Sequence, residues 1–261
     1  MDGNTNAAVA RKHALRRLSL VAVSFIGLTA YAILFRIGPP LPVQQGPSTS
    51  IRNAAPPFVR HAHFKSEHPS ADARHIADWA IDSGDHRDAP FLVVDKKAAR
   101  VYAFDRTGTL IDAAPVLLGI TKGDDTALGV GDKKLSEITA DERTTAAGRF
   151  VAELGRNLRG EDVLWVDYDA GLSLHRVLTT NPGERRVHRL ATPTAADNRI
   201  SYGCINVPAW FFEQVVRRAY AGTRGIVYVL PETRSVEVVF GSYDVDERAR
   251  EMIAPGTFAK R

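Results

Sequence analysis

Short apolar runs separated by Gly, Pro and Asp recur along the chain from about residue 90 onward. Runs of this kind, rich in Val, Leu and aromatic residues, are typical of β-strands. Strands are expected at Phe91–Val94, Arg100–Phe104, Val116–Leu118, Phe150–Leu154, Val163–Tyr168, Leu172–His175, Ile226–Leu230 and Val236–Phe240. This pattern predicts a mainly β domain, a sandwich or barrel, over residues 90–243.

Two segments carry a helical period instead. Pro208 suits a first helical turn, and apolar residues then recur at helical spacing up to Gly222. A shorter helix is expected after Ser70 or Asp72, either of which can cap its N-terminus. Its apolar face would contain Ile76, Ala77, Ala80 and Ile81. The β domain is therefore expected to carry one or two helices.

The N-terminal part of the chain reads as a membrane span. Leu18–Phe35 contains no charged residue, and a helix of that length spans roughly 27 Å, about the thickness of a bilayer's hydrocarbon core. Basic residues gather on its N-terminal side, at Arg11, Lys12, Arg16 and Arg17. This charge bias predicts that residues 1–17 stay in the cytoplasm, that 18–37 form a transmembrane anchor, and that the rest lies outside.

Two alternatives to the anchor remain open. Ala30-Tyr31-Ala32 has the small-x-small form of a signal-peptidase site, so the segment is also compatible with a cleaved signal. A buried core helix is the third alternative, against which the length and the flanking charges argue. The anchor and the signal both export the domain.

Residues 38–89 are predicted to be a linker followed by the short helix. The first part is rich in Pro, Ser, Gln and Gly and has no sustained hydrophobic period. His61, His63 and His68 fall in this region, but scattered histidines in a linker are usually solvated, and no metal site is predicted. Residues 244–261 are charged and unpatterned, and are predicted to be a C-terminal tail.

The composition and charge of the chain are those of a globular protein and do not identify its function. The chain is 44% hydrophobic and 25% charged, which is typical of an ordinary globular domain. Its net charge of +4 comes from basic residues spread along the chain, rather than gathered on one stripe as in nucleic-acid binders. No nucleic-acid partner is expected, and the mild positive charge favours acidic partners.

Cys204 is the single cysteine of the chain, so no internal disulfide can form. It lies shortly before the helix that begins near Pro208, with Arg199 close in sequence, and both features favour the thiolate. Gly203 allows a tight turn that would point the backbone N–H groups of Gly203 and Cys204 at an incoming carbonyl oxygen. By itself a lone cysteine is more often a small buried apolar residue.

The segment Ser201-Tyr-Gly-Cys204-Ile-Asn206 resembles the S-x-G-C-I-R/N signature of L,D-transpeptidases, the YkuD-type domain. The likeness extends upstream. Phe91–Asp105 is similar to the family's opening hairpin, Thr144–Phe150 to its T-P-x-G-x-F element, and Leu172–His175 to the strand that ends in the catalytic histidine. Together these segments cover roughly residues 90–232 in the family's order, which is more specific than the cysteine motif alone.

The resemblance implies a mostly β YkuD-like fold, acyl transfer on peptidoglycan stem peptides, and a role in cell-wall biogenesis and cell shape. It implies Cys204 as the nucleophile and assigns Ser201 and Asn206, with the neighbouring Arg199, to substrate binding. The domain would lie in the periplasm, anchored to a bacterial inner membrane or secreted. No cofactor is implied.

Three positions depart from the family pattern. Tyr202 stands where many members have a second histidine, Ala146 replaces the proline of T-P-x-G, and Arg176 follows His175 where glycine is common. His175 and Cys204 are also twenty-nine positions apart, a longer separation than usual. These departures put the acceptor-side loop and the level of activity in question.

Two histidines are candidates for the base. His175 ends an apolar strand, which is a rigid mount for a group that must reach sulfur. His188 lies in a basic loop and is the alternative base. If it has no catalytic role, it is simply an exposed loop residue. Arg185, Arg186, Arg189 and Arg199 could receive substrate carboxylates by forked hydrogen bonds, or simply form a solvated basic surface.

The sequence therefore predicts a cysteine L,D-transpeptidase that forms a thioester on Cys204 and transfers the acyl group. The acceptor is left open between a second stem peptide, a lipoprotein lysine and water, the last giving an L,D-carboxypeptidase or amidase. A weak or inactive wall-binding scaffold of the same fold is the alternative from another class. A papain-like peptidase is disfavoured by the His-before-Cys order.

Overall fold

The computed structural model describes residues 59–253 of the chain. The predicted membrane segment 18–37 and the last residues of the predicted tail lie outside this range. Within it, no helix combines the length and the apolar character needed to cross a bilayer.

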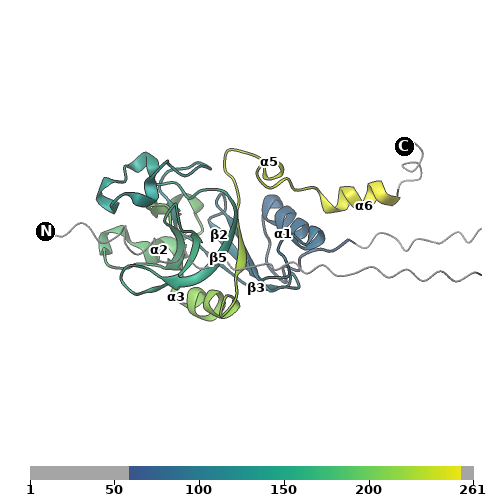
Figure 1. The fold of residues 1–261 in the computed structure, drawn as a ribbon, viewed down its shortest axis with the longest axis horizontal. Coiled ribbons are helices and arrows are strands. Elements are labelled where there is room, and N and C mark those ends of the chain that lie inside the picture. Colours follow the sequence, from purple (N-terminus) through teal and green to yellow (C-terminus); the bar gives the residue numbers. More distant parts are fainter. Residues whose placement is uncertain (1–58, 254–261) are drawn as a thin grey trace, which may run out of the picture. The chain divides into compact units, whose positions relative to one another are not determined.

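The described residues form a mainly β fold with several helices (Figure 1). The strands are β1 Phe91–Asp95, β2 Arg100–Phe104, β3 Leu110–Pro115, β4 Leu118–Gly119, β5 Gly148–Arg156, β6 Asp162–Asp167, β7 Leu172–Arg176, β8 Arg199–Ser201, β9 Ile205–Val207 and β10 Gly225–Val229. The α-helices are α1 Ala71–Ser83, α2 Arg186–Ala191, α3 Ala209–Phe211, α4 Arg217–Ala219, α5 Val236–Phe240 and α6 Val245–Ile253. Shorter helical turns are η2 Val130–Asp132, η3 Leu135–Glu137, η4 Ala140–Glu142, η5 Pro182–Glu184, η6 Ala195–Asn198 and the π-helical η7 Phe212–Val216.

Eight of these strands form one mixed sheet in the order β3-β2-β1-β10-β5-β6-β7-β9. Within this sheet, only β1–β10 and β7–β9 pair in parallel. The remaining strands, β4 and β8, form a separate parallel pair. The two edges of the sheet meet where the chain leaves β3, because Leu117 and Asn206 exchange backbone hydrogen bonds of 2.8 and 2.9 Å. The sheet is thus nearly closed, and the prediction of a mainly β sandwich or barrel is confirmed.

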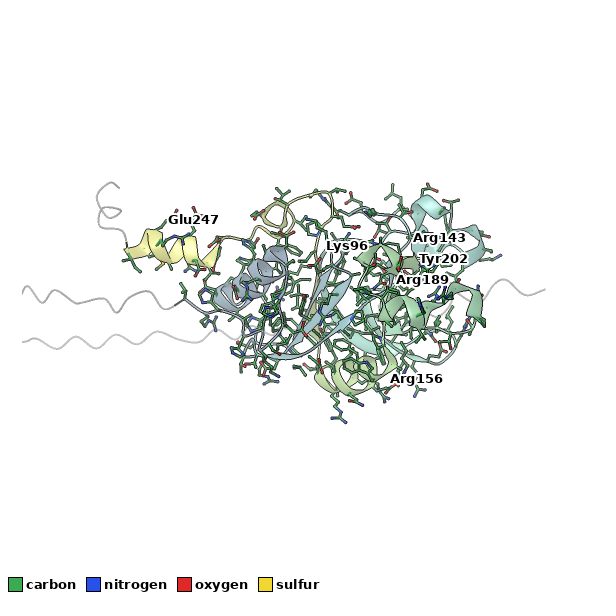
Figure 2. The ribbon with its side chains drawn as sticks, turned by 180° about the vertical axis from the view of Figure 1, so that it is seen from behind. Lys96, Arg143, Arg156, Arg189, Tyr202 and Glu247 are labelled. Atoms are coloured by element: carbon green, nitrogen blue, oxygen red, sulfur yellow. The ribbon has the colours of Figure 1, made fainter. Side chains whose placement is uncertain are left out.

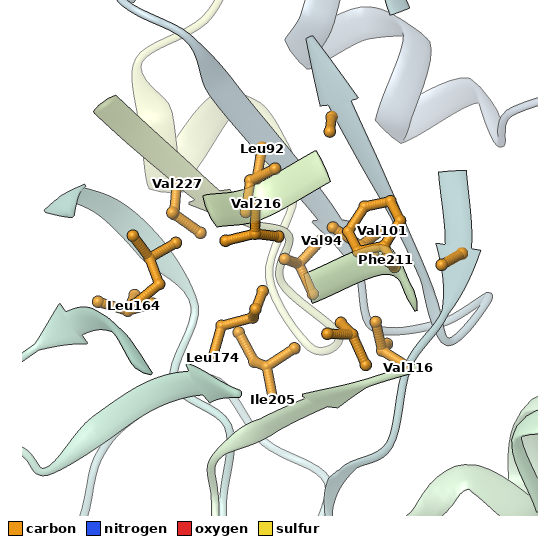
Figure 3. Packing of buried hydrophobic residues seen from close by; sticks show 14 of the residues in the cluster. Leu92, Val94, Val101, Val116, Leu164, Leu174, Ile205, Phe211, Val216 and Val227 are labelled. Atoms are coloured by element: carbon orange, nitrogen blue, oxygen red, sulfur yellow. The ribbon is translucent and has the colours of Figure 1, made fainter. Parts of the chain in front are cut away.

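The two faces of the sheet are covered by two separate hydrophobic cores. Along β1, Leu92 and Val94 enter one core while Phe91 and Val93 enter the other, as the period of a strand requires. Because both faces are covered, β1 is buried at every position, and its first four residues are a continuous apolar run. Figure 3 shows the first core between the sheet and the segment that carries Phe211 and Val216.

The helix predicted after Pro208 is present and runs through α3, η7 and α4 without a break in the chain. Its apolar side, from Phe211 to Val216, packs into the first core. Its middle turn is π-helical, the kind of local widening that π-bulges introduce.

Helix α1 packs on the opposite face of the sheet and begins where the sequence indicated. Ser70 caps it by accepting a hydrogen bond from the Ala73 N–H, and Gly84 ends it in the left-handed region. The residues before it, predicted as linker, also pack on the domain from residue 59. Ala62 and Phe64 are buried in the second core. The packed region therefore begins well before residue 90.

One C-terminal prediction is wrong. Val236–Phe240 was expected as a strand but forms α5, because Ser235 caps its start and Gly241, with a φ of 64°, ends it. A short apolar run of this kind fits both the strand period and the helix period. The capping residues on either side therefore decide its conformation. The predicted tail begins with α6, at whose start Asp244 accepts a hydrogen bond from the Glu247 N–H.

Candidate active site

Two neighbouring parallel strands carry the residues with reactive side chains. Strands β7 and β9 pair with Leu174 opposite Ile205 and His175 opposite Asn206. Paired residues point to the same face, and neighbours along a strand point to opposite faces. Leu174 and Ile205 enter the first core (Figure 3), so His175 and Asn206 face away from it together.

Cys204 immediately precedes β9 and is half-buried on this same outer face. Its sulfur lies 3.6 Å from the hydroxyl oxygen of Ser173, which stands two residues before His175 on β7. The thiol also approaches the carbonyl oxygen of Gly171 at 3.5 Å, as a donor. The strand pairing thus brings together a thiol, an imidazole and a hydroxyl that lie far apart in the sequence.

The proton positions on His175 follow from its neighbours. Nδ1 lies 2.7 Å from the carbonyl oxygen of Arg176, which can only accept, so Nδ1 carries a proton. Nε2 then carries the lone pair, and is the nitrogen that can take a proton from Cys204. Such a backbone acceptor on the far nitrogen fixes both the tautomer and the ring orientation.

Each member of the Cys204–His175 pair shifts the pKa of the other. Burial raises the pKa of Cys204, but interactions with His175 and Ser173 outweigh it and hold that pKa below its ordinary value. Burial lowers the pKa of His175, but Cys204 and the Arg176 carbonyl outweigh it, so its pKa lies above its ordinary value. Both shifts favour the thiolate–imidazolium form.

Gly203 adopts a φ of 123°, in the region that only glycine enters freely. A Cβ at this position would come within 3.0 Å of the Thr144 carbonyl oxygen. The prediction that Gly203 makes a tight turn is therefore confirmed. Its N–H, however, donates to the Ser201 hydroxyl at 3.1 Å, and was wrongly expected to face a substrate.

The Cys204 N–H has no acceptor among the hydrogen bonds of residues 59–253. It is therefore a backbone donor of this loop that is available to a carbonyl oxygen. Ser201, assigned to substrate binding, is buried and donates to the Cys204 carbonyl oxygen at 2.6 Å. Its hydroxyl therefore shapes the loop rather than contacting a ligand.

A pocket of about 130 Å³ opens at Cys204 and is largely apolar. One wall comes from the segment that runs from η2 to η4, which contributes Val130, Leu135 and Ile138. Tyr202 lines another side, and the Arg143 guanidinium stacks 3.8 Å from the centre of its ring (Figure 2). The position where the family has a second histidine is thus part of the pocket wall in this chain.

Arg199 does not reach the pocket with a free guanidinium, so its assignment to substrate binding is wrong. It forms an ion pair with Glu232 in which both side chains are less than 10% exposed, and donates to the Lys96 carbonyl oxygen at 2.8 Å. Lys96 is itself fully buried against Asp124 at 3.1 Å. Unpairing any member of this network would leave a buried charge, so Arg199 is structural.

Asn206 is buried, and its amide is oriented by its neighbours. Its oxygen accepts from the Arg186 guanidinium at 2.7 Å, so its NH₂ group faces His175 Nε2 at 3.4 Å and the Cys204 carbonyl at 3.2 Å. Asn206 therefore belongs to the surroundings of the base. Arg186 comes from α2, within the long segment between His175 and Cys204.

His188, the alternative base, is exposed on α2 and shares none of the contacts that tie His175 to Cys204. Arg176, which follows His175 where glycine is common in the resembled family, pairs with Glu213 and stacks on the Phe212 ring. Its side chain is thus held on the helical segment that follows β9. Ala146, which replaces the proline of T-P-x-G, is buried at the pocket wall.

Two polar residues of the site were not predicted. Ser173 could have been found, because it lies two positions before His175 on one strand and so shares its face. Thr145 is buried and donates to the Gly203 carbonyl at 2.7 Å, a contact between segments far apart in the chain that no local pattern indicates. Among residues 59–253, no three His, Cys, Asp or Glu side chains gather as metal ligands.

Known proteins resemble this chain only distantly. No protein-family model matches the sequence. No curated protein matches it either. Similar solved structures include an L,D-transpeptidase from Mycobacterium smegmatis (14% identity, 54% of this chain and 58% of that one, TM-score 0.29). Others are an L,D-transpeptidase from Enterococcus faecium (17%, 54% and 50%, 0.30) and the helical cell shape determining protein Pgp2 from Campylobacter jejuni (13%, 62% and 52%, 0.38).

The chain spans about half to three fifths of the length of those proteins.

Proposed function

We propose that this protein is a cysteine L,D-transpeptidase of the YkuD type that acts on peptidoglycan stem peptides. The observation that carries the proposal is the pairing of β7 with β9, in which His175 lies opposite Asn206, two residues after Cys204 in an S-x-G-C-I-N motif. The mutual pKa shifts of the two groups support a reactive thiolate at this position.

In the first half-reaction, the Cys204 thiolate attacks the carbonyl carbon that follows the L-centre of a stem peptide. The C–S bond forms and the carbonyl π electrons move to oxygen, where the Cys204 N–H donates to the oxyanion. Collapse restores the carbonyl and breaks the C–N bond to the terminal D-amino acid. His175 Nε2 gives its proton to the departing amine, leaving a thioester and a neutral imidazole.

In the second half-reaction, neutral His175 removes a proton from the acceptor amine as it attacks the thioester. The C–S bond then breaks, which releases the acyl product and restores the Cys204 thiolate beside the imidazolium. The amine of a second stem peptide would give a 3→3 cross-link, and a free D-amino acid would give exchange. A lipoprotein lysine or water would complete the same step. Water would make the enzyme an L,D-carboxypeptidase, so the acceptor is decided by product analysis.

The test uses the full chain in detergent with disaccharide-tetrapeptide muropeptides, followed by chromatography and mass spectrometry. We expect cross-linked or shortened products from the wild type and none from Cys204→Ala. Cys204→Ser, which keeps the shape of the side chain, is the matched control for folding and should retain at most a small residual activity. Product formation by Cys204→Ala would overturn the assignment.

The alternative of an inactive wall-binding scaffold gives a different result. A scaffold would bind muropeptides but would form no covalent adduct with an acylating β-lactam of the carbapenem class. An adduct of the expected mass, mapped to Cys204, favours the enzyme. Binding without an adduct favours the scaffold.

We also propose that residues 18–37 anchor the protein in the inner membrane with the catalytic domain in the periplasm. The uncharged run after a basic N-terminus supports this orientation. Alkaline phosphatase joined after Arg261 should be active in cells, because it folds only outside the cytoplasm. Fractionation then separates the two exported forms, with a membrane-bound full-length chain for an anchor and a shortened soluble chain for a signal.

A further inference from the structure

The peptide group between Gly203 and Cys204 is hydrogen-bonded at its carbonyl end and unpaired at its N–H end within residues 59–253. Its N–H, on Cys204, has no acceptor within residues 59–253. Its carbonyl, on Gly203, accepts a 2.7 Å hydrogen bond from the hydroxyl of Thr145. Because N–H and C=O point in opposite directions across a planar trans peptide, holding the carbonyl fixes the direction of the N–H.

The direction of each hydrogen bond at Thr145 follows from its partners. The Gly119 N–H lies 2.9 Å from Thr145 Oγ1 and can only donate, so the hydroxyl oxygen must accept from it. The hydroxyl proton is then free for Gly203, whose carbonyl can only accept. The hydroxyl thus has one arrangement that satisfies both neighbours.

Thr145 is itself held rigidly. Its side chain is fully buried, and a β-branched side chain has few accessible rotamers. Its backbone carbonyl accepts from the Lys96 ammonium at 2.9 Å. Lys96 is fully buried and paired with Asp124, which in turn accepts from the backbone of the segment after β10. The residue whose hydroxyl bonds to Gly203 is therefore hydrogen-bonded through its backbone to a buried ionic network.

We propose that Thr145 is a positioning residue that aims the Cys204 N–H at the oxyanion formed when the thiolate attacks a carbonyl. The inference rests on the proposed function only in requiring that Cys204 attacks a carbonyl carbon. Without the Thr145 hydroxyl, the Gly203–Cys204 peptide loses the donor that fixes its tilt. The donor N–H then no longer points at one place before the reaction begins.

Two reactions of the same thiol separate this role from a general effect on folding. Acetylation by 4-nitrophenyl acetate passes through an oxyanion, whereas alkylation by iodoacetamide displaces iodide and forms none. In acetylation the thiolate forms a C–S bond and 4-nitrophenolate leaves, which is measured by its absorbance. The chain has one cysteine, so Cys204→Ala gives the background for both reactions.

The quantity compared is the ratio of the acetylation rate to the alkylation rate for the full chain in detergent. Removing one oxyanion donor typically costs about 10²- to 10³-fold, so misaiming it in Thr145→Val should lower this ratio by about 10- to 100-fold. Thr145→Ser, which keeps the hydroxyl, should restore a ratio close to that of the wild type. The pH profile of alkylation should be unchanged in both variants.

Equal losses in the two reactions, leaving the ratio unchanged, would mean that Thr145 only supports the fold and would overturn the proposal. A wild-type ratio no higher than that of a free thiol such as glutathione would overturn it as well. If Thr145→Val does not fold, Thr145→Ala compared with Thr145→Ser carries the same test. These assays contain no peptidoglycan, so a missing muropeptide product would count against the proposed function without touching the role of Thr145.

Discussion

Nε2 of His175 lies 3.4 Å from the amide nitrogen of Asn206, its register partner across the parallel strands β7 and β9. Because Arg186 holds the Asn206 oxygen, the NH₂ group must face the imidazole. An amide NH₂ can donate to a neutral Nε2 but not to a protonated one. Asn206 therefore competes with the thiol for the lone pair of the base.

Asn206→Ala is expected to change the pH profile of Cys204 alkylation. The rise of the rate on the acid side of the profile should move to lower pH. Removing the competing donor favours the imidazolium, and with it the thiolate, by less than about one pH unit, since the contact is long. The measurement is the rate of iodoacetamide alkylation against pH. A shift to higher pH would mean that Asn206 instead holds His175 in the position from which it accepts the proton.

His175→Asn is expected to move the acid-side rise of the same profile in the opposite direction. The pKa of Cys204 is lowered chiefly by His175 against the effect of burial, so without the imidazole it should rise toward or above the ordinary thiol value of about 8.5. At pH 7 the alkylation rate should therefore fall. His188→Asn is the matched control, and a comparable shift in that variant would reassign the base.

Gly203→Ala is expected to lose most acylation of Cys204. The new Cβ would lie within 3.0 Å of the Thr144 carbonyl oxygen at a φ that costs about 1–3 kcal/mol for other residues. The loop must then move, and the Cys204 N–H moves with it. Gly160→Ala is the control, since its φ is also positive at 76° but its Cβ would meet nothing within 4 Å. It should lose stability, measured by thermal unfolding, without losing acylation.

Arg199→Gln is expected to destabilise the fold rather than weaken substrate binding. It leaves Glu232 buried without its main partner, which costs about 3 kcal/mol in the free energy of unfolding. Denaturant unfolding measures this loss, and KM for a muropeptide should stay unchanged in the folded protein. The exposed pair of Arg156 and Asp162 offers the comparison, since Arg156→Gln should cost less than about 1 kcal/mol. A raised KM with unchanged stability in Arg199→Gln would restore the substrate role.

Asp124→Asn should show a pH-dependent loss of stability. Burial raises the pKa of Asp124, but the hydrogen bonds from Thr233, from the backbone and from Lys96 outweigh it and hold that pKa well below its ordinary value. A carboxylate with a depressed folded pKa stabilises the fold above its unfolded pKa of about 3.9 and loses that contribution as the pH falls toward the folded value. The gap in unfolding free energy between wild type and Asp124→Asn should thus be widest near pH 7 and narrow below about pH 4. A gap that does not change with pH would contradict this account of the buried network.

The sequence by itself determined the mainly β class, the helix after Pro208 and the candidate pair Cys204 and His175. These follow from the strand and helix periods of apolar residues, from a capping residue and from a short motif. Each of these signals involves residues that are close together in the sequence. It misjudged Val236–Phe240, where a short apolar run fits two periods and the flanking Ser235 and Gly241 decide for a helix.

Only the tertiary structure decided which polar groups surround the thiol. The register of β7 on β9 set His175 beside Asn206, and a contact across the fold set Thr145 under the Gly203 carbonyl. Arg199 lies next to the motif in sequence, yet its guanidinium is turned to a buried carboxylate whose charge could not be left unpaired. Nearness along the chain indicated the candidate nucleophile, but strand register and charge burial decided what each neighbour of that thiol is able to do.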